Sequence, residues 1–291
     1  MAIILLTGAN GQLGSEIREW QDAHPAANRL IATDVDTLDI TDDVAVAALL
    51  KSEGVEVIVN CAAYTAVDKA EGEPDAARHI NAEGPQVLAA AAREAGATLI
   101  HISTDYVFDG ADPEPRREND PVAPPGVYGT TKLEGEQAVR AEGCRGIILR
   151  TAWLYSSYGN NFVKTMMRLG REKGEVRVVD DQWGAPTYAA DLAAFIMATA
   201  IPALRGKPRY GEVYHYSNLG SASWYLFAEQ IMQLAGIECR VEPVSSAEFA
   251  AVAPRPQFSL LDKTKVMNDF GVRIPEWEDS LEKCMEKLLK A

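Results

Sequence analysis

The 291-residue sequence predicts an α/β fold in which a doubly wound parallel sheet carries a smaller C-terminal lobe. Short apolar segments alternate with longer helical patterns through the first 150 residues, and this alternation is typical of βαβ units. The apolar segments are nearly continuous, as strands buried on both faces require. Right-handed crossovers between such strands place helices on both faces of the sheet.

The first 150 residues supply five strand-length segments and four helical segments. Strands are predicted at residues 3–7, 30–33, 57–60, 98–103 and 147–150, and helices near 12–22, 42–52, 75–95 and 128–142. A helix between successive strands is the connection that parallel pairing needs. We therefore predict a sheet domain over residues 1–150, which also receives a helix from about residues 187–200.

Beyond Arg150 the alternation loosens, and proline- and aromatic-rich loops separate the elements. Helices are expected at residues 162–173, 189–200, 224–235, 262–270 and 276–289, and strands at 176–179 and 212–217. These elements predict a smaller lobe that takes most of residues 151–291, with a boundary interleaved with the first domain. Doubly wound sheets bind ligands outside the carboxyl ends of their strands. The cleft between sheet and lobe is therefore the expected binding site, with the lobe binding the substrate.

Composition disfavours several classes of function. The formal net charge of −14 disfavours nucleic acid and anionic membrane surfaces as partners, although simple solubility also explains this charge. The four cysteines, Cys61, Cys144, Cys239 and Cys284, form no CxxC pair, which argues against a disulfide framework or a zinc site. The four histidines show no HxxxH or HExxH spacing. We expect no catalytic metal.

No secretion signal or membrane span is expected from the sequence. Residues 2–6 are apolar, but no basic region precedes them and a glycine follows directly. The longest other apolar stretch, residues 192–204, contains Pro202 and is too short to cross a bilayer. Together with cysteines that look reduced, these features predict a cytoplasmic protein.

A glycine-rich turn follows the first predicted strand. Residues 8–14 form a GxxGxxG motif between a strand and a helix. The first glycine permits a tight turn, the second lets the backbone approach a pyrophosphate, and the third lets the helix pack closely. The helix N-terminus offers free amides to phosphates. An ordinary turn is the alternative, but the position at the start of a βαβ series favours a Rossmann-type dinucleotide site. Its predicted cofactor-binding residues are Gly8, Asn10, Gly11, Gln12, Leu13 and Gly14.

Two further segments are expected beside the dinucleotide. Asp34 follows the second strand, where a carboxylate would bind an adenine ribose hydroxyl and favour NAD over NADP. Because Asp36 is close by, a simple loop aspartate is the alternative interpretation. Asp39 and Ile40 are candidates for the adenine border. After the third strand, Ala62, Ala63 and Tyr64 would let the cofactor lie close to the backbone, whereas simple packing is the alternative for the alanines.

The sequence also contains a YxxxK motif, formed by Tyr128 and Lys132. Residues four apart share one face of a helix. A lysine ammonium beside a phenol stabilises the phenolate and lowers the tyrosine pKa towards working pH. Such a pair suits carbonyl reduction, in which hydride reaches carbon and a proton must reach the oxygen. Alone the motif often marks a surface pair, but the glycine turn upstream favours catalysis by Tyr128 and Lys132, which would also contact the cofactor.

Polar residues follow the fourth predicted strand. Ser103 and Thr104 are placed where a hydroxyl can orient a substrate oxygen, and Asp105 comes next. Capping of a turn is the alternative role for the two hydroxyls, and a turn residue is the alternative for Asp105. We count Thr104 as a third catalytic candidate.

These motifs together resemble the extended short-chain dehydrogenases/reductases, and within them the dTDP-4-dehydrorhamnose reductase family. The specific phrases are AYTAVDKAE at residues 63–71, STDYVFDG at 103–110, RTAWLY at 150–155 and DQWGAPT at 181–187. Tyr128-Gly129 with Lys132, and Arg255-Pro256 with Ser259, extend the likeness over nearly the whole chain. The resemblance implies reduction of the 4-keto group of dTDP-4-dehydro-L-rhamnose to dTDP-L-rhamnose, for polysaccharide biosynthesis.

By matching position, the resemblance also implies roles for individual residues. Tyr128 would be the acid, Lys132 would hold the nicotinamide ribose and tune Tyr128, and Thr104 would bind the reacting oxygen. The implied substrate-binding set is Thr104, Asp105, Tyr106, Trp153, Asn161, Gln182, Gly184, Pro186, Thr187 and Arg255. Core packing is the alternative for Trp153 and Trp183, and a surface salt bridge is the alternative for Arg255.

The resemblance leaves the cofactor and the assembly open. Members of the family often accept NADPH or NADH; Asp34 argues for NADH, and no arginine beside it in sequence settles the question. Some relatives form magnesium-bridged dimers, but no ligands for magnesium can be placed here, and the chain is expected to be a monomer or homodimer. Two other hypotheses are a reductase or epimerase of another nucleotide-linked 4-keto sugar and a non-catalytic regulatory subunit, which tends to lose the Tyr–Lys pair.

Overall fold

A six-stranded parallel sheet forms the centre of the larger part of the molecule in this computed structural model, which describes residues 1–249 and 251–290. The strand order is β10-β5-β4-β3-β1-β2. The strands are β1 (Ile3–Thr7), β2 (Arg29–Ala32), β3 (Val57–Asn60), β4 (Thr98–Thr104), β5 (Arg145–Thr151) and β10 (Tyr210–His215), and every neighbouring pair is parallel. The order reverses beside β1, so the predicted doubly wound sheet is confirmed.

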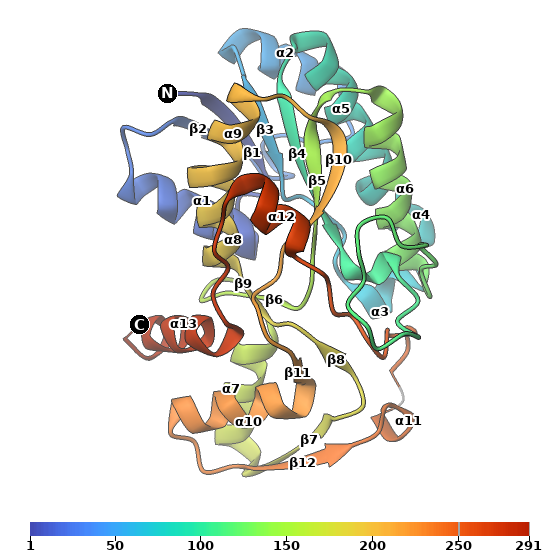
Figure 1. Cartoon of the computed structure of the whole chain (residues 1–291), viewed down its shortest axis with the longest axis vertical. Helices are drawn as coiled ribbons and strands as arrows, with labels where there is room; N and C mark the ends of the chain where they lie inside the picture. The colour runs from blue at the N-terminus through green and yellow to red at the C-terminus, as the bar shows by residue number, and fades with distance from the viewer. Residues whose placement is uncertain (250, 291) are drawn as a thin grey trace.

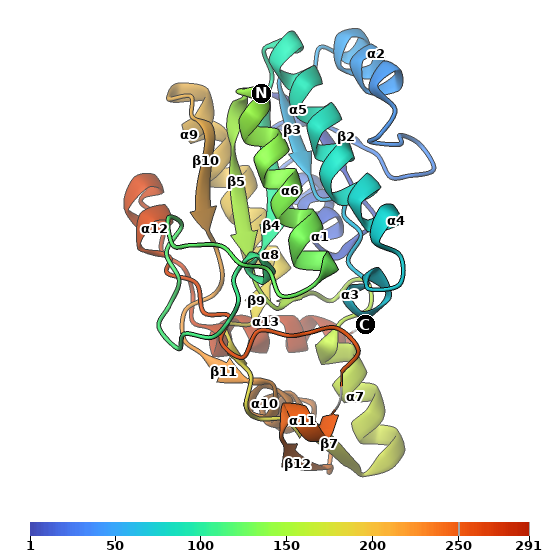
Figure 2. The ribbon, with the colours of Figure 1, turned by 90° about the vertical axis from the view of Figure 1, so that its right-hand side faces the viewer.

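Helices cover both faces of this sheet, as Figures 1 and 2 show. One face packs against α1 (Gln12–Ala23) and the run α8 (Ala189–Phe195), η3 (Ile196–Ala200) and α9 (Ile201–Gly206). The other face packs against α2 (Asp43–Glu53), α5 (Gly84–Ala95) and α6 (Val127–Glu142). The central strands β1 and β3 are almost wholly buried, because their apolar runs face helices on both sides.

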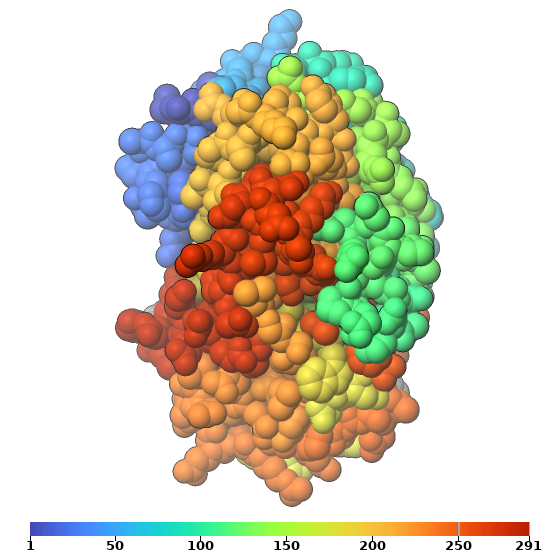
Figure 3. All heavy atoms as spheres, in the orientation of Figure 1, coloured from blue at the N-terminus to red at the C-terminus, as the bar shows by residue number. Residues whose placement is uncertain are grey.

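Short elements join the larger ones around the sheet. α3 (Val67–Ala70), α4 (Pro74–Arg78) and the π-helical turn η1 (His79–Glu83) lead from β3 into α5, and the 3-10 turn η2 (Asp105–Val107) follows β4. α12 (Thr264–Phe270) lies beside β10, and its Val266 belongs to the core that α1 and α8 share. Figure 3 shows the α12 segment covering the front of the molecule between the sheet and the lobe.

The smaller lobe has its own apolar core below the sheet in Figure 1. Its helices are α7 (Phe162–Lys173), α10 (Trp224–Ala235), α11 (Ser246–Phe249) and α13 (Trp277–Lys290). Its strands form three two-stranded pairs: β7 (Glu175–Val179) with β12 (Arg240–Val244), β8 (Trp183–Gly184) with β11 (Ala222–Ser223), and β6 (Leu154–Tyr155) with β9 (Thr187–Tyr188). The predicted smaller C-terminal lobe is thereby confirmed.

Two parts of the C-terminal half differ from the sequence prediction. The strand expected in the lobe at residues 212–217 is β10, which pairs with β5 at the edge of the main sheet. The stretch expected to be too short for a bilayer is a continuous helical run, Ala189–Gly206, which by length and composition alone is apolar enough to cross one. Half of that run is buried against α1 and the sheet, which is the pattern of a core helix. The π-helical turn at 196–200 accommodates Pro202 within the run.

Candidate active site

A cavity of about 760 Å³ lies at the carboxyl edge of the sheet, between the sheet and the lobe. Its lining comes from the loops after β1 to β5, from α6 and from the first residue of α10. Seventeen of the predicted site residues line it: Gly8, Gly11, Gln12, Leu13, Gly14, Asp34, Asp39, Ile40, Ala62, Ala63, Thr104, Asp105, Tyr106, Tyr128, Lys132, Trp153 and Arg255. The carboxyl-edge position is the one that the fold class predicts.

The glycine turn packs so closely that side chains would clash. A Cβ at Gly8, where φ is +66°, would lie 2.6 Å from the Ala62 nitrogen, and one at Gly14 would lie 2.3 Å from the Gly8 oxygen. Helix α1 begins at Gln12, and Gly11 before it provides no side-chain cap. The first N–H groups of α1 therefore remain available at the cavity, and this arrangement fits a dinucleotide pyrophosphate.

Asp34 lines the cavity, whereas its sequence neighbour Asp36 does not. The Asp34 Oδ2 accepts a hydrogen bond of 2.9 Å from the Asn10 backbone N–H, so Asn10 supports the carboxylate from outside the lining. Arg18, in the second turn of α1, donates to the Asn10 side-chain oxygen at 3.3 Å. No arginine lies beside Asp34 in the sequence; in the structure Arg18 approaches this loop through its bond to Asn10, whose backbone N–H bonds Asp34.

Tyr64 is the one predicted residue of the 62–64 segment that does not line the cavity. Its hydroxyl donates to Glu73 at 2.7 Å, and its backbone N–H donates to the Asn81 side chain at 2.8 Å. Asn81 sits in the π-helical turn η1 and also donates to Thr131 of α6 at 3.1 Å. This buried asparagine thus ties the loop after β3 to the helix that carries Tyr128 and Lys132.

Tyr128 and Lys132 lie on the cavity side of α6. The Lys132 side chain is buried, and its ammonium donates a 2.7 Å hydrogen bond to the carbonyl oxygen of Ile102. Burial lowers the pKa of Lys132 to about 8, against the charge of Glu136, which raises it. Tyr128 and Lys132 therefore share one face of α6, as predicted, and the Lys132 ammonium is anchored near the end of β4.

The phenol of Tyr128 holds its proton firmly. Burial raises its pKa to about 12, and its hydrogen bond with Thr104 offsets only part of that rise. The prediction that Lys132 brings this pKa down towards neutrality is wrong in this structure, because the lysine ammonium is directed at Ile102. A neutral phenol is the form from which a proton can be donated.

Thr104 and Asp105 form a buried polar pair beside Tyr128. The Thr104 hydroxyl donates to the Asp105 Oδ1 at 2.9 Å and accepts from the Tyr106 N–H at 3.3 Å, so the predicted capping role and the cavity position coexist. Burial raises the pKa of Asp105 to about 7, and hydrogen bonds from Thr104 and Ser259 oppose that rise. Tyr106 packs edge-on against Tyr128, with ring centroids 5.5 Å apart.

A buried ion pair stands behind this group, and sequence analysis did not single it out. Arg150 donates to both carboxylate oxygens of Glu136, at 2.8 and 2.7 Å, and both side chains are less than 5% exposed. Ser103 lines the cavity, but its hydroxyl is engaged by this carboxylate, to which it donates at 2.6 Å. Glu136 lies one turn beyond Lys132 on α6. Its spacing of four residues from Lys132 was the sequence signal that could have identified Glu136 as a neighbour of that lysine.

Trp153 and Arg255 line the cavity on the side of the lobe. Trp153 is partly exposed, and its indole stacks on that of Trp224. Arg255 lines the cavity while its guanidinium bonds Asp68 at 3.0 Å, so the salt bridge and the cavity position predicted as alternatives occur together. Asp68 also accepts from the Ala253 N–H at 3.1 Å, which fixes this loop beside α3.

Five residues of the implied substrate set lie outside the lining. Asn161 caps α7 and donates to Ser156 and Gln12, while Gln182 donates to Ser246 at 2.8 Å. Gly184, Pro186 and Thr187 are buried behind Trp153: a Cβ at Gly184 would lie 2.4 Å from that indole, and the Thr187 N–H bonds the Trp153 carbonyl at 3.1 Å. The DQWGAPT phrase therefore supports the cavity wall from behind.

Several lining residues were missed from the sequence. They are Val35, Leu38, Cys61, Thr65, Val67, Ile80, Ile102, Thr151, Ala152, Leu154, Gly159, Asn160 and Trp224. Thr65 and Val67 belong to the AYTAVDKAE phrase, which was a usable signal, whereas nothing local marks Trp224. Among the described residues no group of three or more His, Cys, Asp or Glu side chains is placed to hold a metal ion, so the structure does not support a magnesium site.

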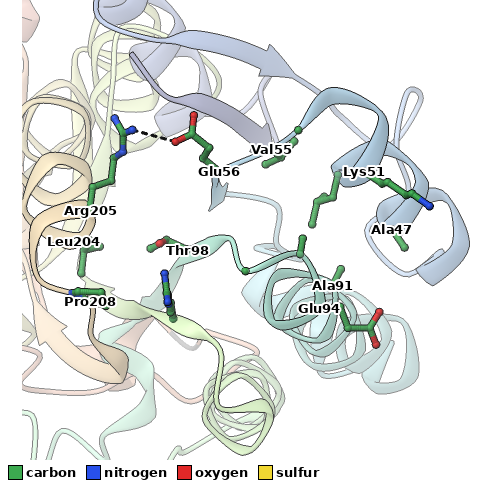
Figure 4. Close-up of a pocket in the computed structure, with 15 residues that line it drawn as sticks. Ala47, Lys51, Val55, Glu56, Ala91, Glu94, Thr98, Leu204, Arg205 and Pro208 are labelled. Carbon is green, nitrogen blue, oxygen red and sulfur yellow. Dashed lines mark hydrogen bonds and ion pairs between the residues drawn. The ribbon is translucent and has the colours of Figure 1, made fainter.

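A second cavity, of about 680 Å³, lies at the opposite edge of the sheet (Figure 4). It is bordered by residues where β3, β4 and β5 begin, including Glu56, Thr98 and Arg145, and by the Arg205–Glu56 ion pair at 3.0 Å. No predicted site residue lines it. Loops that precede parallel strands are not where doubly wound sheets bind ligands, so the carboxyl-edge cavity is the candidate active site.

The glycine turn at an open helix N-terminus, together with a Tyr–Lys pair in the same cavity, defines a nicotinamide-dependent oxidoreductase of the Rossmann type. The chain belongs to the family described as "RmlD substrate binding domain", whose model matches residues 1–290. This assignment agrees with the resemblance seen in the sequence motifs.

Individual relatives give the same result. A dTDP-4-dehydrorhamnose reductase of Streptomyces griseus is 45% identical over 90% of this chain and 86% of that protein. The solved structure of a dTDP-4-dehydrorhamnose reductase from Clostridium acetobutylicum is 44% identical, with a TM-score of 0.92 over 99% of each chain. A reductase of the same name from Bacillus anthracis, solved in complex with NADP, is 42% identical, with a TM-score of 0.92 over 98% of this chain and 99% of that one.

Proposed function

We propose that the chain reduces the 4-keto group of dTDP-4-dehydro-L-rhamnose to give dTDP-L-rhamnose, with NADPH or NADH as the reductant. The observation that carries the proposal is the meeting of Tyr128, Thr104 and Lys132 with the glycine turn in one cavity. Relatives named for this reaction support the choice of substrate. The regulatory-subunit hypothesis is disfavoured because the Tyr–Lys pair is present and lies in the cavity.

The nicotinamide, when bound, supplies a hydride to C4 of the sugar. Tyr128 donates its phenolic proton to the 4-oxygen as charge develops there, which completes the C–H and O–H bonds of the new alcohol. Thr104, which shares a hydrogen bond with Tyr128, orients the same oxygen. The resulting phenolate regains a proton from solvent. A preorganised donor pair of this kind stabilises the developing oxyanion.

Lys132 serves the cofactor side of the cavity in this proposal. Its buried ammonium is anchored at the Ile102 carbonyl, on the same side of α6 as Tyr128. We infer that the same ammonium holds the nicotinamide ribose when the cofactor is bound. Because Lys132 has a pKa of about 8, it remains mostly charged at neutral pH.

Cofactor selection is proposed to rest on Asp34 and Arg18 together. Asp34 would bind a ribose 2′-hydroxyl and repel a 2′-phosphate, whereas Arg18 would attract that phosphate. The two effects oppose each other, so we expect both NADH and NADPH to serve. The four cysteines are free, which suits the reducing cytoplasm where we place the reaction.

An absorbance assay at the nicotinamide band tests the proposal. Purified protein is mixed with dTDP-4-dehydro-L-rhamnose and either NADPH or NADH, and other nucleotide-linked 4-keto sugars are run in parallel. The proposal predicts cofactor oxidation that depends on the rhamnose precursor. Faster turnover of a different keto-sugar would transfer the assignment to that substrate.

A further inference from the structure

Trp153 has an unusual backbone conformation at the cavity. Its φ is +48°, and among the described residues it is the one non-glycine residue with a positive φ. A bulky side chain rarely adopts this region, and such conformations persist where surrounding contacts enforce them. The Trp153 carbonyl is held by the Thr187 N–H, and the indole fits against Gly184, where a Cβ would lie 2.4 Å away.

Trp224 stacks on the Trp153 indole. The two rings are parallel, with an interplanar angle of 6° and centroids 3.5 Å apart. Trp224 is the first residue of α10, whose N-terminus is capped by Ser223, and Ser223 itself donates to Asp180 at 2.5 Å. Phe162 of α7 supports Trp224, with centroids 4.6 Å apart.

Core packing alone does not explain this pair. Both indoles are partly exposed, whereas the aromatic core residue Phe227, one turn along α10, is fully buried. Both indoles also line the candidate active-site cavity. A rigid, partly exposed aromatic surface at a cavity wall is suited to an amphipathic ligand.

We propose that Trp224 is a sugar-binding residue, and that the stacked Trp153–Trp224 pair forms the wall against which the apolar C–H face of the substrate hexose packs. The inference rests on the proposed function and adds a residue from the lobe helix α10 to the site. A 6-deoxyhexose has a methyl group in place of a hydroxymethyl, which increases the apolar surface that such a wall can bury.

Two substitutions separate a sugar contact from a packing role. Trp224→Leu removes the wall, and Phe162→Leu is the matched control, because Phe162 packs on Trp224 but does not line the cavity. Trp224→Phe keeps an aromatic ring and remains informative if the leucine variant folds poorly. For each protein we would measure kcat and KM for the keto-sugar, and Kd for dTDP-L-rhamnose and for dTDP, which lacks the hexose.

The inference predicts that Trp224→Leu raises KM for the keto-sugar and Kd for dTDP-L-rhamnose by about five- to tenfold, with kcat and the Kd of dTDP nearly unchanged. Trp224→Phe should give a smaller loss of the same kind, and Phe162→Leu should give none. Unchanged sugar affinity in both Trp224 variants would overturn the inference, as would an equal loss in Phe162→Leu or in dTDP binding. Lack of turnover by the unsubstituted protein would instead overturn the proposed function, while the dTDP-L-rhamnose and dTDP affinities would still decide the role of Trp224.

Discussion

The two halves of the cavity are built in different ways. The half proposed for the cofactor consists of the glycine turn and the loop after β3, held by backbone approaches too close for side chains, and of Asp34, held by the Asn10 N–H. The half proposed for the sugar consists of Trp153, Trp224 and Arg255, which come from distant parts of the chain and are held by ring stacking and an ion pair. Tyr128, Thr104 and Lys132 lie between them. The difference teaches that a local motif can specify the cofactor half, whereas the sugar half depends on tertiary contacts.

The largest predicted effect comes from the residue between the halves. Tyr128→Phe removes the proton donor and should lower kcat by about 10²- to 10⁴-fold, since that is the usual contribution of a general acid. Binding of NADPH, followed by its fluorescence, and binding of dTDP should both persist. If the variant kept full keto-sugar reduction, Tyr128 would not be the acid, and its position between the two halves would have no catalytic meaning.

A change confined to the cofactor half should be next in size. Gly14→Ala places a Cβ 2.3 Å from the Gly8 oxygen and displaces the turn from α1. We expect a fall of about 10²-fold in kcat/KM for the cofactor, the scale of a 1 Å misplacement. The affinity for dTDP should be retained. Gly206→Ala is the control, because its added Cβ meets nothing within 4 Å. An equal fall in that variant would show that close packing at Gly14 is not the cause.

The buried ion pair offers a pH test. The Glu136 charge raises the pKa of Lys132, so Glu136→Gln should lower that pKa below about 8. The ammonium is then lost at lower pH, and the alkaline limb of kcat/KM should move to lower pH by about one unit. Leaving Arg150 buried without its partner should also cost about 3–5 kcal/mol of unfolding free energy, so the profile is recorded well below the melting temperature.

The matched control for this substitution lies on the same helix. Glu134→Gln removes an exposed partner of Arg78, and neither the pH profile nor the stability should change appreciably. An alkaline limb that stays in place in Glu136→Gln would show that Lys132 does not set it.

The smallest predicted effect concerns cofactor choice. Arg18→Ala should raise KM for NADPH by about two- to fivefold, because Arg18 is exposed and its attraction for a 2′-phosphate is screened. KM for NADH should not change. Arg29→Ala removes another exposed arginine, which pairs with Glu53, and serves as the control. Equal changes in both cofactors would exclude a role in phosphate recognition.

Sequence reasoning predicted most of the sheet because its information is local. Strand β3 lies at the predicted residues 57–60, since four successive apolar or buried positions need no partner to be identified. Strand β10 was assigned to the lobe because it follows Arg150, where the alternation of strands and helices loosens, and only its pairing with β5 shows where it belongs. The apolar run at 189–206 was misjudged because a single proline suggested an end that the π-helical turn removes.

The candidate site was predictable to a similar extent and for the same reason. The residues of the glycine turn and Tyr128 follow from motifs with fixed spacing, and their cavity positions were predicted correctly, apart from Asn10. Trp224 carries no local signal and lies 71 positions after Trp153, so only the fold brings the two rings together. The tuning of Tyr128 was also misjudged, because spacing on a helix does not show that Lys132 is directed at Ile102.

The central claim is that a hydride reaches C4 of the sugar while Tyr128 supplies the proton. It is tested most directly by incubating the protein with dTDP-4-dehydro-L-rhamnose and reduced nicotinamide cofactor carrying deuterium at both C4 positions, and locating the label in the product by mass spectrometry and NMR. The account predicts dTDP-L-rhamnose with a single deuterium at C4 of the hexose. Product without deuterium at that carbon, or no oxidation of either cofactor, would contradict it.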